Sequence, residues 1–242
     1  EDFKATIRAM GQAGIPVLGY AWIPDQVWRT AKAMHGRGGA LVTGYDHAIG
    51  AGIATGTLPP RDEAAMWATW ERFIDAVLPV AEQAGVKLAL HPDDPPVPAL
   101  DGVARIFRSE VAFARAMSRA DSPNHGIAFC TGTFAEAGAE TMMAALARFA
   151  RARRIHYVHL RSVAGALPRF AESFIDEGSV DAVAVLRTLH DAGFDGFVID
   201  DHVPHVVGDT VWGHRSRAYA TGFIAGILRA LGAEHPRGET TP

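Results

Sequence analysis

Residues 196–202 read GFVIDDH: a short apolar run, typical of a buried strand, is closed by two carboxylates and an imidazole. Four further apolar runs of this kind precede it in the chain, at residues 15–23, 86–91, 126–130 and 155–161. Such near-continuous runs are typical of parallel strands that are covered on both faces. Segments with helical periodicity lie between them, and this alternation predicts an α/β fold with a parallel sheet.

The segments between these strands differ in character. Residues 62–84 carry apolar side chains at spacings of 4 and 3 residues, which predicts a long amphipathic helix that ends at Gly85. Residues 24–61 show little periodicity, and we expect a loop excursion above the sheet there. Residues 202–214 are predicted to form a second long loop. Long loops within a compact domain are often functional, so both segments are of interest.

The composition is that of a globular domain. The chain has 242 residues, of which 48% are hydrophobic and 21% are charged, with a formal net charge of −4. Charges of both signs are interspersed, which gives no support for nucleic-acid binding, and no apolar run reaches the roughly 18 residues of a membrane span. The single cysteine, Cys130, excludes an internal disulfide and favours a reducing cytoplasm. We predict one barrel domain over residues 1–233 and a polar, disordered tail over 234–242.

Four of the predicted strands are followed by side chains that bind metals. His91, Cys130, His159 and Asp201 each stand at the carboxyl end of a successive strand. Taken alone, a strand cysteine is usually a small buried hydrophobe, and an aspartate at a strand end is usually a cap or loop partner. The carboxyl ends of parallel strands meet on one face, where active sites lie. The four together therefore predict a shared metal site.

The identity of the metal stays open on this donor set. Two imidazoles, a thiolate and a carboxylate suit Zn²⁺, Fe²⁺, Co²⁺ or Mn²⁺, and the thiolate favours the softer ions. Four protein ligands would close a tetrahedral site. A catalytic ion would need five or six positions, so that substrate and water can also bind.

Charged residues near these ligands are further candidates. Arg161 lies two residues after His159 and should point to the same side, where a guanidinium suits a substrate carboxylate; the alternative is a salt bridge to Asp200 or Asp93. Asp93 and Asp94 form a stiff, proline-bounded acidic loop; one of them is a candidate to orient His91, and Asp93 is also a candidate to contact the substrate. His202 is the best candidate for a general acid or base, because imidazole titrates near neutral pH.

At these residues the sequence resembles the mannonate dehydratase family. The stretches that carry the resemblance are LALHPDDPP (88–96), GIAFCTGT (126–133), IHYVHLRSV (155–163), FIDEGSVD (174–181) and DHVP (201–204). The resemblance implies a xylose-isomerase-like TIM (β/α)8 barrel, with a Mn²⁺ or Fe²⁺ site made by the four ligands above. It implies conversion of D-mannonate to 2-keto-3-deoxy-D-gluconate and water in hexuronate breakdown, with His202 as the catalytic histidine.

The sequence departs from the family pattern in three places. Members of the family carry about three further strands before the part that matches residue 1, so we expect an incomplete barrel. Trp212 stands where the family has a catalytic tyrosine and is therefore a candidate substrate contact, and Ala21 stands where the family has an amide side chain. These changes leave two alternatives to dehydration: isomerisation or epimerisation of another sugar, or metal binding without catalysis. The expected partner is a small sugar acid, and the aromatic content is compatible with a homodimer.

Overall fold

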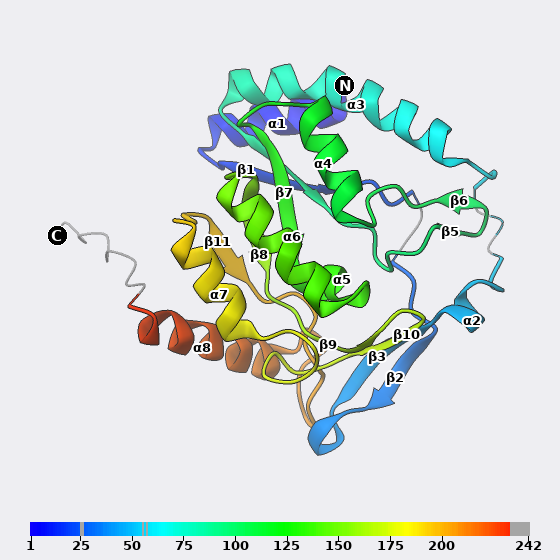
Figure 1. Cartoon of the computed structure of the whole chain (residues 1–242), viewed down its shortest axis with the longest axis vertical. Coiled ribbons are helices and arrows are strands. Elements are labelled where there is room, and N and C mark those ends of the chain that lie inside the picture. The colour runs from blue at the N-terminus through cyan, green and yellow to red at the C-terminus, as the bar shows by residue number, and fades with distance from the viewer. Residues whose placement is uncertain (25–26, 55, 57, 233–242) are drawn as a thin grey trace.

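The computed structural model describes residues 1–24, 27–54, 56 and 58–232. Its main feature is a parallel five-stranded sheet in the order β1-β4-β7-β8-β11 (Figure 1). The strands are β1 (Val17–Ala21), β4 (Lys87–His91), β7 (His125–Cys130), β8 (Ile155–His159) and β11 (Phe197–Ile199). The five predicted strands are therefore confirmed; four are shorter than their apolar runs, and β7 begins one residue earlier than its run.

The burial of these strands explains their apolar sequences. All six residues of β7, the central strand, are buried, whereas the edge strands β1 and β11 are partly exposed. The buried apolar side chains of the sheet and of its helices form one continuous cluster. A strand covered on both faces must be apolar at nearly every position, and this is the reason for the continuous runs.

Helices precede, connect and follow the strands of the sheet. They are α1 (Asp2–Gln12), α3 (Glu63–Ala84), α4 (Glu110–Arg119), α5 (Thr131–Glu136), α6 (Ala139–Arg151), α7 (Ala182–Asp191) and α8 (His214–Ala230). The predicted long helix corresponds to α3, which begins where Asp62 accepts a hydrogen bond from Ala65 N at 2.7 Å. It ends at Gly85, which has a positive φ of 68° and closes the last turn.

A second sheet stands where the sequence predicted an irregular loop. Four antiparallel strands form it in the order β2-β3-β10-β9; they are β2 (Ala31–His35), β3 (Leu41–Asp46), β10 (Arg169–Glu172) and β9 (Val163–Ala166). We call it the accessory sheet; Figure 1 shows it at one end of the parallel sheet. The prediction of a loop over 24–61 was wrong, because β3 pairs with β10 more than 100 residues later in the chain. Such a pairing leaves little local periodicity in the sequence.

The smaller elements complete the connections. They are the 3-10 turn η1 (Arg37–Gly39), α2 (His47–Gly50) and the short pair β5 (Ala99–Leu100) and β6 (Val103–Ala104). The predicted long loop between β11 and α8 is confirmed, and it is tied to the accessory sheet. His205 and Leu41 exchange backbone hydrogen bonds of 2.8 Å in both directions.

The parallel sheet is open rather than closed. Five strands over the described residues fall short of the eight that close a TIM barrel, in agreement with the predicted partial barrel. The tail predicted at 234–242 lies outside the described residues. Within the described ranges, no helix is both long and apolar enough to cross a lipid bilayer.

Candidate metal centre

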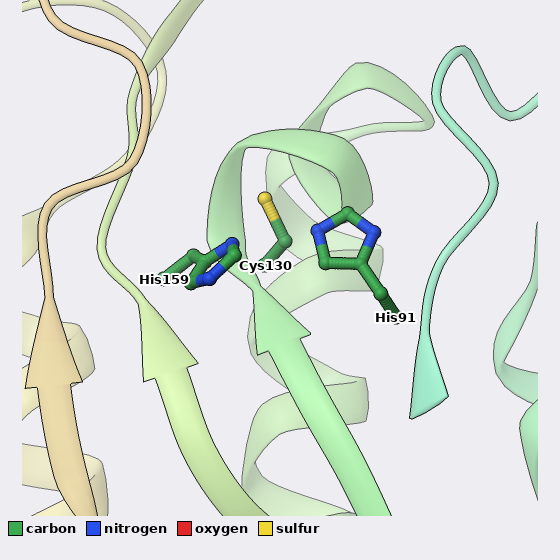
Figure 2. A group of neighbouring side chains, drawn as sticks. All are labelled: His91, Cys130 and His159. Atoms are coloured by element: carbon green, nitrogen blue, oxygen red, sulfur yellow. The ribbon is translucent and has the colours of Figure 1, made fainter. Parts of the chain in front are cut away.

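Three of the predicted ligands meet at the carboxyl ends of neighbouring strands. His91 is the last residue of β4, Cys130 of β7 and His159 of β8. One ligand atom from each lies within 4.8 Å of the other two. Figure 2 shows the Cys130 sulfur between the two imidazole rings. The parallel register places Cys130 directly opposite His159, so the strand ends lie level and their side chains converge.

Asp201, the fourth predicted ligand, lies beside two of these three. Its Oδ2 is 3.7 Å from Cys130 Sγ and 3.6 Å from His159 Nδ1. Asp201 follows β11, which pairs with β8 so that Ile199 stands opposite His159. All four residues are therefore brought to one place by the order of the sheet, although 110 positions separate the first from the last.

The electrostatics of the cluster favour a bound cation. Burial alone would raise the pKa of the Cys130 thiol, but hydrogen bonds from His159 and His91 and the charge of Arg161 outweigh it and hold the pKa well below its usual range. Burial and the neighbouring thiolate raise the pKa of Asp201. A carboxylate next to a thiolate in a buried place is costly unless a positive charge lies between them.

The donor atoms fit a divalent transition-metal ion. His159 Nδ1 is buried and has no hydrogen-bond partner among the described residues, since Asp201 Oδ2 at 3.6 Å is too distant. The Nδ1 of His91 is 2.7 Å from Pro92 O, which fixes the ring and leaves Nε2 for a metal. Imidazole nitrogen, thiolate and carboxylate thus converge on one place, as ligands of a common ion would.

The structure places Arg161 differently from the predicted substrate contact. The side chain is fully buried, and its guanidinium donates to Glu172 Oε2 at 2.8 Å, to Asp94 Oδ2 at 3.0 Å and to Glu136 Oε1 at 2.6 Å. Nη2 of Arg161 also donates to Glu172 Oε1, and Nη1 also donates to Thr133 Oγ1. With every N–H engaged, this geometry does not support binding of a substrate carboxylate. A salt bridge is formed, but neither to Asp93 nor to Asp200.

Arg29 completes this buried ion cluster. Its Nη1 and Nη2 donate to the two oxygens of Asp94 at 2.7 and 2.8 Å, and Nη2 also donates to Glu172 Oε1 at 2.9 Å. Arg29, Glu136 and Glu172 were not predicted from sequence, and Asp94, expected at most to orient His91, instead binds the two arginines. Each is an ordinary charged residue in sequence, and only its burial reveals a role. We call Arg29, Arg161, Asp94, Glu136 and Glu172 the buried ion cluster.

Asp93 and Trp212, the other two predicted substrate contacts, face elsewhere. Asp93 is buried and accepts a hydrogen bond from Phe107 N at 2.7 Å, with Arg105 Nη1 at 4.0 Å; burial raises the pKa of its carboxyl to about 6. These contacts hold the Asp93 side chain against the segment around Phe107 rather than toward the pocket. Trp212 is 71% exposed, and its carbonyl oxygen accepts a bond from Arg217 Nε at 3.0 Å. Neither residue lines the pocket beside the metal ligands.

His202 lies between the metal ligands and the buried ion cluster. Its Nδ1 is 3.0 Å from Glu172 Oε1, and its Nε2 is 3.8 Å from Asp201 Oδ2. Burial would lower the pKa of this imidazole, but the hydrogen bond to Glu172 and the charge of Asp201 outweigh it and raise the pKa. The side chain is 37% exposed, so one edge of the ring is open to solvent.

A pocket of about 500 Å³ opens beside His202 and Asp201. Its walls come from the accessory sheet and from the loop after β11, and they include Lys32, Thr43 and His205. A second cavity of about 590 Å³ lies at the opposite, amino-terminal ends of the strands, around Lys87 and His156, and contains none of the metal ligands. The first pocket is therefore the candidate binding site, although the second is larger.

The fold and the site together define a class of protein: a xylose-isomerase-like α/β barrel with metal-binding side chains at the carboxyl ends of its strands. In agreement, the chain is similar to a xylose isomerase domain protein from Planctomyces limnophilus, with a TM-score of 0.63 at 17% identity over 96% of this chain and 67% of the other. At this identity the similarity shows the fold alone.

More specific similarities identify the family. The family model of D-mannonate dehydratase (UxuA) matches residues 59–237. Mannonate dehydratase 2 of Halalkalibacterium halodurans is 31% identical over 98% of this chain and 74% of its own length. The crystal structure of mannonate dehydratase from Streptococcus suis serotype 2 has a TM-score of 0.87 at 29% identity, covering 98% of this chain and 72% of that one. The chain belongs to the D-mannonate dehydratase family.

Proposed function

We propose that this chain is a metal-dependent hydro-lyase that converts D-mannonate to 2-keto-3-deoxy-D-gluconate and water, a step in hexuronate breakdown. One observation carries the proposal: in a member of the D-mannonate dehydratase family, His91, Cys130 and His159 cluster beside Asp201, and Asp201 and His202 line a pocket. The reducing cytoplasm is the proposed location, since the buried Cys130 must stay a free thiol to act as a ligand.

The proposed cofactor is Mn²⁺ or Fe²⁺, held by His91, Cys130, His159 and Asp201; Zn²⁺ and Co²⁺ suit the same donors. A bound ion would act as a Lewis acid that stabilises negative charge developing on a substrate oxygen. Metal analysis of the purified protein, with anaerobic reconstitution by each ion in turn, identifies the ion that supports turnover.

His202 is the proposed proton carrier. Dehydration removes a proton from C2 of the sugar acid and the hydroxyl group from C3, and the hydroxyl must gain a proton to leave as water. Since Nδ1 of His202 is engaged by Glu172, Nε2 is the atom that faces Asp201 and the pocket. We assign both transfers to Nε2: its lone pair accepts the proton from C2, and the imidazolium so formed returns a proton to the departing hydroxyl, which leaves as water.

Lys32 is the proposed contact for the substrate carboxylate. The guanidinium of Arg161 is fully engaged, so another cation must meet this charge. Lys32 lines the pocket from β2, and within the part of the chain that the structure describes it has no ion-pair partner. By contrast, Arg217, another cation of the pocket wall, is paired with Asp200 at 2.6 Å.

Isomerisation or epimerisation of a related sugar is the second candidate. It is favoured by the missing phenol at Trp212, whose side chain is turned out to solvent. Ala21 adds to it, since this residue stands opposite His91 in the register of β1 and β4, so the absent amide would have been next to a ligand.

A panel of aldonates and ketoses, each assayed with Mn²⁺- and Fe²⁺-loaded protein, separates the candidates. Formation of 2-keto-3-deoxy-D-gluconate from D-mannonate supports dehydration. Turnover of ketoses without turnover of any aldonate supports the second candidate. Metal binding without turnover of any member of the panel contradicts both and leaves a metal-binding homologue. A homodimer stays a prediction, to be tested by sedimentation.

A further inference from the structure

Glu172 is a buried carboxylate that joins the accessory sheet to His202. It is the last residue of β10, and its side chain is 5% exposed. Its Oε1 is 3.0 Å from His202 Nδ1 and accepts from Arg161 Nη2 at 2.6 Å and from Arg29 Nη2 at 2.9 Å; its Oε2 accepts from Arg161 Nε at 2.8 Å. No other described side chain hydrogen-bonds to His202.

The two arginines fix both the charge and the orientation of this carboxylate. Arg161 binds it through two parallel N–H donors, an arrangement that sets the plane of the carboxylate as well as its position. Burial would raise the pKa of Glu172, but the charge of Arg161 and the hydrogen bond from His202 outweigh it and lower the pKa to about 2. Glu172 therefore presents a fixed, ionised acceptor to His202 Nδ1.

We propose that Glu172 is the positioning residue of His202: it holds the hydrogen on Nδ1 and turns Nε2 toward Asp201 and the pocket. The inference rests on the proposed role of His202 and deepens it. A carboxylate that binds one ring nitrogen selects the tautomer in which the other nitrogen carries the lone pair. Without it, the half-exposed ring could rotate, and Nε2 would face the substrate only part of the time.

The accessory sheet therefore takes part in the orientation of His202. Glu172 belongs to β10 and Arg29 lies just before β2, whereas His202 follows a strand of the parallel sheet. The same Arg161 that orients Glu172 also lies 3.8 Å from Cys130 Sγ, so one guanidinium contacts a metal ligand and the residue that orients His202. The accessory sheet thus supplies part of the catalytic geometry as well as a wall of the pocket.

A double-mutant cycle in the metal-loaded protein separates positioning from a purely structural role. Glu172→Gln keeps the shape of the side chain but removes the charge. We expect kcat to fall about 10- to 100-fold with KM changed less than about 3-fold, because the orientation of the proton carrier acts on the chemical step. In the His202→Ala background we expect Glu172→Gln to have no further effect on kcat, since the residue that it positions is gone.

Two further variants serve as controls. Glu172→Asp keeps the charge but withdraws the carboxylate from His202, so positioning predicts a loss similar to that of Glu172→Gln, whereas charge balance alone predicts near wild-type turnover. Glu136→Gln is the matched control, because Glu136 is equally buried and bonds to the same arginine, but does not touch His202. We expect it to keep kcat within about 3-fold of the wild-type value. Metal content and Tm are measured for every variant.

A measurement on the wild-type protein covers the case in which a variant fails to fold. Nitrogen-15 NMR of histidine in the Zn²⁺-loaded protein, at alkaline pH, reports which ring nitrogen of His202 carries the hydrogen. We expect hydrogen on Nδ1; hydrogen on Nε2 overturns the inference. It is also overturned if Glu172→Gln keeps kcat within about 3-fold, or lowers kcat equally with and without His202. If the wild-type protein does not act on D-mannonate, the proposed function fails, and the NMR result still decides the role of Glu172.

Discussion

Arg161 shows how the partner of a side chain, rather than its type, sets its role. Its position after His159 made it a candidate for a substrate carboxylate, and it does lie at the site, with Nη1 3.8 Å from Cys130 Sγ. Three buried carboxylates engage it instead, so its charge supports the thiolate and orients Glu172. His202, which was assigned from sequence, keeps an open edge and a free nitrogen, and so is suited to proton transfer.

Replacement of His202 tests its role as proton carrier. We expect His202→Ala to bind the metal normally but to lose about 100- to 10,000-fold in kcat, the usual contribution of a general acid or base. Metal content per chain and initial rates with D-mannonate measure the two effects. Unchanged turnover would disprove the role, and loss of metal would instead make His202 part of the metal site.

The buried His125 should make the protein sensitive to acid. Its Nε2 is 2.9 Å from the hydroxyl of Tyr20 and its Nδ1 is 3.3 Å from Ala120 O, and burial lowers the pKa of the ring to about 4. Between about pH 6.5 and pH 4 an unfolded chain binds this proton and the folded chain does not. The free energy of unfolding should therefore fall by up to about 3 kcal/mol as the pH drops through this window.

Denaturant unfolding of the wild-type protein and of His125→Gln between pH 7 and pH 4 checks this expectation. The variant should be less stable at pH 7 and should lose less stability on acidification, although His156, whose pKa burial also lowers to about 4, keeps part of the slope. His190→Gln serves as the control, since that side chain is 47% exposed on α7. Parallel pH curves for wild type and His125→Gln would contradict the assignment.

At the scale of the elements, the accessory sheet and the loop after β11 form the walls of a pocket beside the strand ends of the parallel sheet. The strand ends of the parallel sheet supply three of the proposed metal ligands, and the loop after β11 supplies Asp201. The accessory sheet supplies Lys32 from β2, Thr43 from β3 and Glu172 from β10, and the loop supplies His205, which is paired with Leu41 of β3. Substrate recognition is thus expected to depend on the accessory sheet, and the binding of the metal on the parallel sheet.

Replacement of Lys32 tests whether substrate recognition depends on the accessory sheet. Lys32→Met keeps the length of the side chain and removes its charge, so we expect KM for D-mannonate to rise about 10-fold or more through the loss of a charged contact, with metal content unchanged. Steady-state kinetics at two ionic strengths measure the effect. Lys87→Met, in the cavity at the opposite ends of the strands, is the matched control and should leave KM unchanged. Equal KM values for both variants would exclude Lys32 as the carboxylate contact.

For the molecule as a whole, the metal is expected to act as a cross-link. Its proposed ligands come from the ends of β4, β7 and β8 and from the loop after β11, so a bound ion joins four segments that are distant in sequence. An ion that binds the folded chain and not the unfolded chain raises stability in proportion to the logarithm of its concentration relative to Kd.

Removal of the metal should therefore lower the Tm. We expect chelation to reduce the Tm of the wild-type protein by several degrees, since about 2.7 kcal/mol is gained at a hundredfold excess over Kd. Cys130→Ser, which replaces the thiolate by a weak hydroxyl donor, should bind the ion at least about 10-fold more weakly and should respond less to chelator. Calorimetric scans with and without chelator measure both. Equal responses in the two proteins would show that Cys130 is not a ligand.

The sequence by itself determined the parallel strands and the ligands at their ends, because both follow from local patterns. A strand buried on two faces is apolar along its length, and the ends of parallel strands converge whatever the details of the fold. His91, Cys130, His159, Asp201 and His202 could therefore be assigned from sequence to one end of the sheet, where they do lie together; their roles stay predictions. The tertiary structure alone decided the accessory sheet, the partners of Arg161 and the position of Glu172. Strand pairing between β3 and β10 and the pairing of buried charges join residues that are far apart in the chain, and no local periodicity records which charge meets which.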